Sequence, residues 1–177
     1  MDSPAGTTYP LTYSPTETLG VGFLEKTLKL SQAEVVMSLW DLGGAQEFLT
    51  MLPMVCADAV AILFLFDLTN SASLSSVKAW YKEVRRLNRT ALPMLVGTKF
   101  DMFYENMSAE EQASTVKQAR KYSKAMKAPL IFCSSARSIN IAKLFKLLFC
   151  RVFDVPITLA PITGDGEPLL EWSATEE

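Results

Sequence analysis

The sequence predicts an α/β fold in which a mostly parallel β-sheet is flanked by helices. Residues 59–66 are apolar at every position. A strand of this kind must be covered on both faces, as in a parallel sheet between helices. Further strand patterns alternate with helical patterns along the chain, which indicates the same class. The 177 residues are 49% hydrophobic and 20% charged, enough for one domain with a substantial core.

The first third of the chain reads as an irregular tail followed by paired strands. The tail, residues 1–15, is rich in Pro, Thr and Ser without a period. Residues 21–30 and 33–40 are expected to be two strands joined by a tight turn near Ser31-Gln32. Residues 45–55 are expected to hold a short, irregular helix broken by Pro53. The domain proper is therefore assigned to residues 16–155.

The rest of the chain alternates helices and strands. Asp67 to Asn70 is expected to be a loop, with Ser71 or Ser73 as N-cap of the next helix. Ser108 and Glu111 form the sequence pattern of a capping box, which opens a helix running to about Lys127. Buried strands are expected at residues 92–96 and 129–133, a last helix at residues 141–152, and a surface tail over residues 156–177.

The composition excludes several classes of function. The chain has no histidine, which removes triad chemistry and most metal centres that use imidazole. The net charge of −2 gives no reason to expect a nucleic-acid partner or a polybasic membrane anchor. Cys56, Cys133 and Cys150 are isolated in apolar surroundings and read as reduced thiols of a cytoplasmic protein. No apolar run is long enough to span a bilayer and the C-terminus lacks a prenylation cysteine, so we expect neither membrane insertion nor a lipid anchor.

Chemically informative residues follow three of the predicted strands. They are Asp41 with Gly44, then Thr98-Lys99-Phe100-Asp101, and then Ser135-Ala136-Arg137. Because the carboxyl ends of parallel strands share one edge of a sheet, the three groups are expected to face the same crevice. Each pattern alone is also typical of an ordinary turn or helix N-cap, and their ordered combination carries the prediction.

These residues suit recognition of guanine. The Asp101 carboxylate can accept hydrogen bonds from the N1–H and 2-amino groups of guanine, a pair of donors that adenine lacks. The stem of Lys99 can cover one face of the base. Backbone N–H groups around Ser135-Ala136 can meet the guanine carbonyl. Asp41 suits a water-mediated magnesium site, and Gly44 suits a backbone that approaches a terminal phosphate.

The ordered motifs Thr18-Leu19-Gly20, Trp40-Asp41-Leu42-Gly43-Gly44, Thr98-Lys99-Phe100-Asp101 and Ser135-Ala136-Arg137 resemble those of the Ras-like small GTPases, whose sheet is of the P-loop-NTPase type. Met51-Leu52-Pro53-Met54-Val55-Cys56 and Ala128-Pro129-Leu130-Ile131-Phe132 are similar to the septum-promoting GTPases of the septation-initiation and mitotic-exit networks. The resemblance covers roughly residues 18–172.

This resemblance implies GTP or GDP with Mg²⁺ as cofactors. Thr18 would sense the γ-phosphate through magnesium, with Asp41 as the outer-sphere ligand and Gly44 as the switch glycine. Thr98, Lys99 and Asp101 would read guanine, helped by Ser135, Ala136 and Arg137. The implied partners are a two-part GTPase-activating complex and an effector protein kinase, and the implied location is the spindle pole.

The sequence departs from the family in two places. It contains no G-x-x-x-x-G-K-[ST] motif to cradle the phosphates. It also has Ala45 where a catalytic glutamine is expected, with Gln46 one position later. We therefore expect an incomplete domain that lacks the usual first strand, phosphate loop and first helix, and that binds and hydrolyses GTP weakly. A nucleotide-free pseudo-GTPase serving as an interaction module, or a truncated product without function, remain alternatives at this stage.

Overall fold

The computed structural model describes residues 17–29 and 34–172. The chain divides into two compact units at Met51 and Leu52, and each unit is considered separately. The expected tail at residues 1–15 and the turn at Ser31-Gln32 lie outside the described residues.

The first unit is an antiparallel pair of strands followed by a short helix. Strand β1 (Val21–Lys29) pairs with β2 (Glu34–Leu42) along its whole length, as the two apolar runs predicted. Side chains of β2 alternate between half-buried and exposed positions, the signature of a strand with one covered face. The 3-10 helix η1 (Gln46–Met51) follows.

The second unit holds a four-stranded sheet in the order β3-β4-β5-β6. Strands β3 (Ala61–Asp67), β4 (Leu92–Thr98) and β5 (Leu130–Phe132) run parallel to one another, and β6 (Leu170–Glu171) is antiparallel to β5. The mostly parallel sheet confirms the predicted fold class. Because β3, β4 and β5 point the same way, Asp67, Thr98 and the residues after Phe132 reach the same edge.

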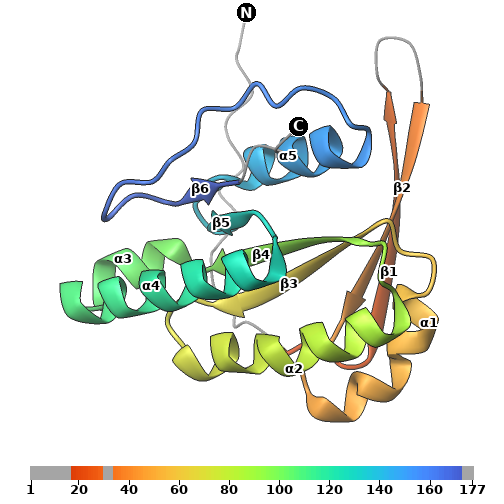
Figure 1. The fold of residues 1–177 in the computed structure, drawn as a ribbon, viewed down its shortest axis with the longest axis horizontal. Helices are drawn as coiled ribbons and strands as arrows, with labels where there is room; N and C mark the ends of the chain where they lie inside the picture. The colour runs from red at the N-terminus through yellow and green to blue at the C-terminus, as the bar shows by residue number, and fades with distance from the viewer. Residues whose placement is uncertain (1–16, 30–33, 173–177) are drawn as a thin grey trace, which may run out of the picture. The chain divides into compact units, whose positions relative to one another are not determined.

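Helices cover both faces of this sheet. Its helices are α1 (Leu52–Cys56), α2 (Ser71–Leu87), α3 (Phe100–Asn106), α4 (Ala109–Met126) and α5 (Ile141–Val152). Figure 1 shows α5 on one side of β3 and β4 and α2 on the other. On the α2 side, the ring of Phe64 meets that of Tyr81 at 5.5 Å between centroids.

The two faces of the sheet bury different side chains. On the α5 side, one cluster joins buried residues of the strands and of the helix: Met94, Val96, Ile131, Cys133, Leu144, Leu147, Leu148 and Leu170. On the opposite side, the Phe132 ring packs edge-on against those of Phe66 and Phe103. The two covered faces explain why β4 and β5 lack polar alternation, whereas β3 carries an apolar side chain, Leu65, that is 61% exposed.

Residues 156–172 do more than cross the surface. Their last part forms β6, where Leu169 and Leu170 are almost fully buried. The Arg120 guanidinium on α4 binds the Glu171 carboxylate with N–O distances of 2.6 and 3.0 Å, and also donates to the Thr163 carbonyl. The segment is thus attached to the sheet by backbone pairing, apolar burial and an ion pair.

Local details differ from the sequence-based expectations at three points. Asn70, not Ser71 or Ser73, is the N-cap of α2, and its side chain accepts from the Ala72 N–H. Pro53 does not break a helix, because it lies in the first turn of α1, where a proline costs no hydrogen bond. Residues 100–106, where no element was predicted from the sequence, form helix α3. The capping box of Ser108 and Glu111 is confirmed.

Asn88 links the α2–β4 connection to the segment after α1. Its buried amide nitrogen lies 2.7 Å from the Cys56 carbonyl and 3.0 Å from the Ala59 carbonyl. Its amide oxygen accepts from the backbone N–H groups of Thr90 and Ala91. One side chain thus binds backbone groups of two loops, and the bonds to the Cys56 carbonyl and from the Ala91 N–H are buried.

We expect Asn88→Ala to lower the free energy of unfolding by about 3 kcal/mol, because it leaves several buried backbone groups unpaired. Urea denaturation followed by circular dichroism measures the change. Asn106→Ala, at the exposed C-terminal end of α3, is the matched control and should change stability by less than about 0.5 kcal/mol. Equal effects of the two substitutions would contradict the assigned role of Asn88.

Candidate functional site

The carboxyl end of β4 is held in an unusual backbone conformation. Lys99 is left-handed, with φ of 60°, and serves as the N-cap of α3. The Phe100 N–H donates to the Cys133 carbonyl at 3.0 Å, and the Cys133 N–H donates to the Gly97 carbonyl at 2.8 Å. These two bonds extend the β4–β5 pairing beyond the strands, so the segment 97–101 is tied directly to the segment after β5.

Gly97 is needed for this close approach. A Cβ built at Gly97 would lie 2.8 Å from the Leu68 side chain and 2.9 Å from the Phe132 ring. The absence of a side chain therefore lets neighbouring loops close around the strand end.

The segment after β5 forms a tight loop with an exposed tip. Ser134 is fully buried; its N–H donates to the Ile139 carbonyl, and its hydroxyl accepts from the Arg137 N–H at 3.1 Å. These bonds turn the tip outward, so Ser135, Ala136 and Arg137 are exposed. The Arg137 guanidinium lies 3.9 Å from the Glu105 carboxylate of α3, a contact between two exposed side chains.

The carboxylate of Asp101 stands in the first turn of α3, directly after this junction. Asp101 is half-buried, and within the part of the chain that the structure describes its carboxylate has no hydrogen-bond or ion-pair partner. A carboxylate that lacks a partner among the described residues can accept from a ligand that offers two donors, as guanine does.

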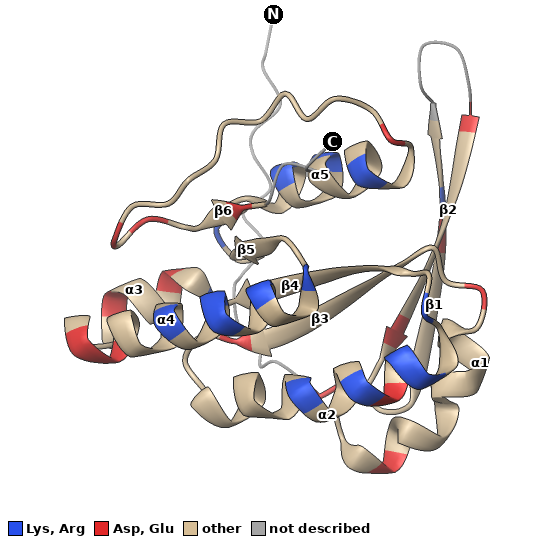
Figure 2. Ribbon diagram, in the orientation of Figure 1, with Lys and Arg blue, Asp and Glu red and all other residues tan. Residues whose placement is uncertain are grey.

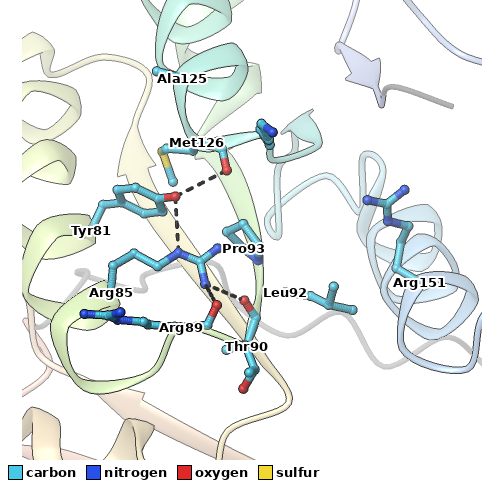
Figure 3. Close-up of a pocket in the computed structure, with 11 residues that line it drawn as sticks. Tyr81, Arg85, Arg89, Thr90, Leu92, Pro93, Ala125, Met126 and Arg151 are labelled. Carbon is cyan, nitrogen blue, oxygen red and sulfur yellow. Dashed lines mark hydrogen bonds between the residues drawn. The ribbon is translucent and has the colours of Figure 1, made fainter. Parts of the chain in front are cut away.

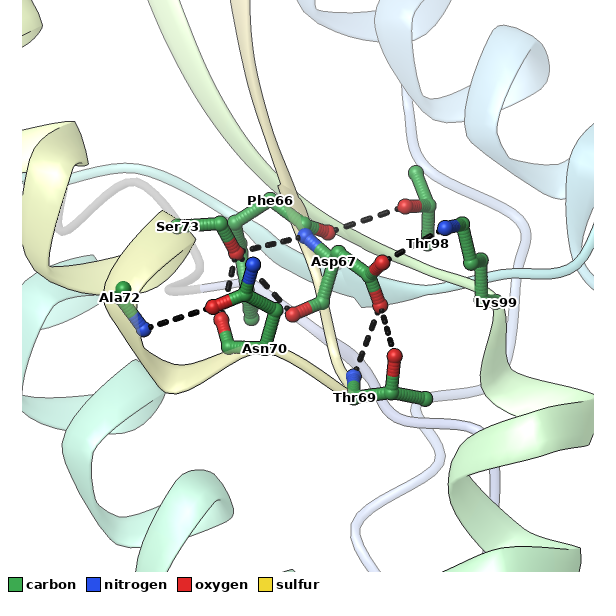
Figure 4. Close-up of polar contacts among 8 residues, drawn as sticks. All are labelled: Phe66, Asp67, Thr69, Asn70, Ala72, Ser73, Thr98 and Lys99. Carbon is green, nitrogen blue, oxygen red and sulfur yellow. Dashed lines mark hydrogen bonds and ion pairs between the residues drawn. The ribbon is translucent and has the colours of Figure 1, made fainter. Parts of the chain in front are cut away.

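Lys99 uses its ammonium group to bind Asp67. Figure 4 shows the contact between the ends of β3 and β4, with Nζ and Oδ2 2.7 Å apart. The other carboxylate oxygen of Asp67 accepts from the backbone N–H and hydroxyl of Thr69 at 2.8 and 2.6 Å. Thr98 completes the junction by donating its hydroxyl to the Phe66 carbonyl at 3.0 Å.

This network sets the protonation state of Asp67. Partial burial by itself would raise the pKa of the carboxyl, but the hydrogen bonds from Lys99 and Thr69 and the charge of Lys99 outweigh it, so the pKa is lowered. The ionised Asp67 carboxylate therefore holds the Lys99 ammonium group across the ends of β3 and β4. The aliphatic stem of Lys99 stays partly exposed at this edge of the sheet.

The first unit places a second group of candidate residues together. The Thr18 hydroxyl donates to the Asp41 carboxylate at 3.1 Å, and the Gly43 N–H donates to the Gly20 carbonyl at 2.9 Å. A Cβ at Gly43 would overlap the Thr18 carbonyl and lie 2.7 Å from the Phe48 ring. Gly44, by contrast, has open space around it. Gln46 is exposed at the start of η1.

The structure thus brings Thr98, Lys99, Asp101 and the 135–137 tip to one edge of the second unit, and Thr18 and Asp41 to one end of the hairpin in the first unit. Sequence reasoning missed the part played by Asp67, because its pairing with Lys99 depends on which strands become neighbours. It also missed Asn140, whose buried amide donates to the carbonyls of Phe132 and Pro168 and fixes the base of the 134–140 loop.

Two further observations concern metal ligands and membrane-spanning helices. The described residues include no group of three or more His, Cys, Asp or Glu that could hold a metal ion. No helix in the described ranges has the length and apolar character needed to cross a membrane.

Comparison with known proteins identifies the class. The model of the Ras family matches residues 7–154, and the chain belongs to this family of small GTPases. Ras-type GTPases in general bind guanine nucleotide and Mg²⁺.

Comparison with individual relatives gives the degree of sequence identity. The chain is 52% identical to Septum-promoting GTP-binding protein 1 of Schizosaccharomyces pombe over 157 residues, which are 89% of this chain and 79% of the relative. It is 30% identical to human Ras-related protein Rab-37 over 72% of this chain and 55% of that protein. It is 26% identical to human Ras-related protein Rab-30 over 86% and 76% of the two chains. The resemblance to septum-promoting GTPases drawn from the sequence is confirmed.

The Asp67–Lys99 pair predicts a specific dependence of stability on pH. The pKa of Asp67 is lower in the folded chain than in the unfolded chain, where it is about 4. The ionised carboxylate therefore stabilises the fold fully at pH values above about 4. That contribution is lost as the pH falls through the folded pKa. We expect Asp67→Asn to cost about 1 kcal/mol at pH 7 and progressively less as the pH falls from about 4 to 2.5.

Chemical denaturation of the wild-type chain and the variant at both pH values measures this difference. Asp58→Asn, at an exposed carboxylate after α1, is the matched control and should show no loss at either pH. A loss for Asp67→Asn that persists unchanged at pH 2.5 would mean that the carboxylate charge is not what stabilises the junction.

Proposed function

We propose that the chain is a guanine-nucleotide-dependent signalling switch that acts in septation and mitotic exit, with weakened binding and hydrolysis of GTP. The observation that supports this proposal is an Asp101 carboxylate without a partner among the described residues, at the same sheet edge as the exposed Ser135-Ala136 tip, in a chain 52% identical to a septum-promoting GTP-binding protein. In this proposal Asp101 selects guanine over adenine, because an adenine would leave its carboxylate without donors.

Other residues complete the proposed site. The stem of Lys99, anchored by Asp67, covers one face of the base, and the Thr98 hydroxyl fixes the strand end below it. Ser135 and Ala136 offer backbone N–H groups to the base carbonyl, and Arg137, whose N–H donates to the Ser134 hydroxyl, holds the shape of the tip. Thr18 and Asp41, already hydrogen-bonded to each other, would hold Mg²⁺ through water, and the magnesium would neutralise charge on the terminal phosphates.

The part of the proposed site that would bind the phosphates lacks its usual residues. The sequence has no G-x-x-x-x-G-K-[ST] motif, so it supplies neither the ring of backbone N–H groups nor the lysine that bind the α- and β-phosphates. Ala45 cannot orient a water, and Gln46 lies one residue away from the expected position. Hydrolysis is therefore expected to be slow, with the base contributing most of the affinity.

The missing motif also favours a second candidate function. A nucleotide-free pseudo-GTPase would keep the fold and its protein-binding surfaces while binding no nucleotide. The partners in either case would be those implied by the resemblance: a two-part GTPase-activating complex and a protein kinase. A truncated product without function would bind neither nucleotide nor partner.

Binding of fluorescently labelled GDP and ADP in magnesium buffer tests the proposal. We expect at least a tenfold preference for GDP, and we expect Asp101→Asn to remove that preference because the amide places a donor against the guanine donors. Glu110→Gln, an exposed acid on α4, is the matched control and should keep the preference.

Two outcomes would contradict a nucleotide-dependent switch. Absence of any binding would favour the pseudo-GTPase, and equal affinity for GDP and ADP would remove Asp101 from base recognition.

A further inference from the structure

A basic pocket lies at the opposite end of β4 from the candidate guanine site. It has a volume of about 390 Å³ and is bordered by the C-terminal ends of α2, α4 and α5 and by the start of β4. Figure 3 shows Tyr81 and Arg85 on one side of Leu92 and Arg151 on the other. Since β4 spans seven residues, the two sites are about 20 Å apart.

The charge of this pocket is not balanced. Four cations line it, Arg85, Arg89, Lys127 and Arg151, and none of its eleven lining residues is acidic. In the described chain, Arg89, Lys127 and Arg151 have no hydrogen-bond or ion-pair partner for their side chains. Lys and Arg also cover the C-terminal half of α2 and the surface of α5 (Figure 2). Like charges held together in this way favour an anionic ligand.

The floor of the pocket is rigid. Arg85 donates from Nε to the Tyr81 hydroxyl at 3.2 Å and from Nη1 to the carbonyls of Arg89 and Ala91 at 3.0 and 2.9 Å. Its guanidinium lies 5.2 Å from the centre of the Tyr81 ring, and the Tyr81 hydroxyl donates to the Met126 carbonyl. These neutral acceptors fix Arg85 without neutralising it, and among residues 17–29 and 34–172 no hydrogen bond occupies its Nη2 group.

We propose that this pocket binds a phosphate monoester on a phosphorylated segment of a partner protein. A phosphate monoester carries a charge near −2 and three acceptor oxygens at pH 7, which matches several cations converging from different elements better than a carboxylate does. An anionic membrane is a poorer match, because the chain as a whole carries a net charge of −2 and the cations gather in a single concave site.

Nuclear magnetic resonance of the ¹⁵N-labelled 177-residue chain tests the proposal with a defined probe, the blocked peptide Gly-Gly-phosphoserine-Gly-Gly. We expect saturable shifts of the Thr90, Ala91 and Lys127 amides, and none at Ala136. Arg89→Gln combined with Arg151→Gln should weaken the affinity at least tenfold. Lys127 is left unchanged, because its left-handed backbone, with φ of 51°, constrains substitution.

Controls separate this proposal from other roles of the same cations. The unphosphorylated peptide should not bind, and Lys117→Gln, at an exposed lysine in the middle of α4, should leave the affinity within twofold of wild type. Thermal melting of each variant verifies folding. Inorganic phosphate should bind at the same amides but more weakly than the phosphopeptide.

Three results would overturn the proposal. One is equal binding of the unphosphorylated peptide. Another is an affinity for the phosphopeptide that stays the same after the double substitution, in a variant that still folds. In that case the cations would only stabilise the helix C-termini. The third is binding to vesicles of phosphatidylcholine with 5% phosphatidylinositol 4-phosphate without binding of the phosphopeptide. Nucleotide affinity at Asp101 does not enter these outcomes, so the two proposals fail independently.

Discussion

The parallel register of β3, β4 and β5 is the constraint on which the candidate site depends. It brings Asp67, Thr98 and the segment after Phe132 to one edge, and the backbone bonds joining Gly97, Cys133 and Phe100 lock the last two together. The left-handed Lys99 then starts α3 in the direction that presents Asp101. A change in register would separate the carboxylate from the 135–137 tip, even though every residue of both motifs was still present.

The sequence predicted the elements whose signals are local. The capping box of Ser108 and Glu111 needs only four consecutive residues. The apolar run of β3 predicted burial on both faces, but Leu65 is 61% exposed. The sequence also predicted that Asp41, Asp101 and Ser135 would share one edge. Parallel strands bring Asp101 and Ser135 to the same edge, whereas Asp41 lies in β2, which pairs with β1 in a separate two-stranded sheet. Features that depend on which segments become neighbours were harder. Asp67 contacts Lys99 only after β3 and β4 have paired. The two-residue strand β6 forms by pairing with β5, and its own sequence is too short to predict a strand.

The two ends of β4 have contrasting chemistry. At the carboxyl end, the Asp101 carboxylate has no partner among the described residues and lies at the same sheet edge as the exposed 135–137 tip, which suits a neutral base rich in hydrogen-bonding groups. At the amino end, uncompensated cations gather around a fixed arginine, which suits a compact anion. β4 thus separates the proposed site for a nucleotide base from the proposed site for a phosphorylated partner, so each proposal can be tested without the other.

The most direct measurement of the central claim is chemical-shift mapping of the labelled chain with guanosine monophosphate and adenosine monophosphate at millimolar concentrations. This tests base recognition apart from the phosphate contacts that the sequence does not supply. We expect guanosine monophosphate to shift the amides of Asp101, Ser135 and Ala136 in a saturable way, and adenosine monophosphate to leave them nearly unchanged. Shifts of equal size with both nucleotides, or none at these three residues, would contradict a guanine site at this edge.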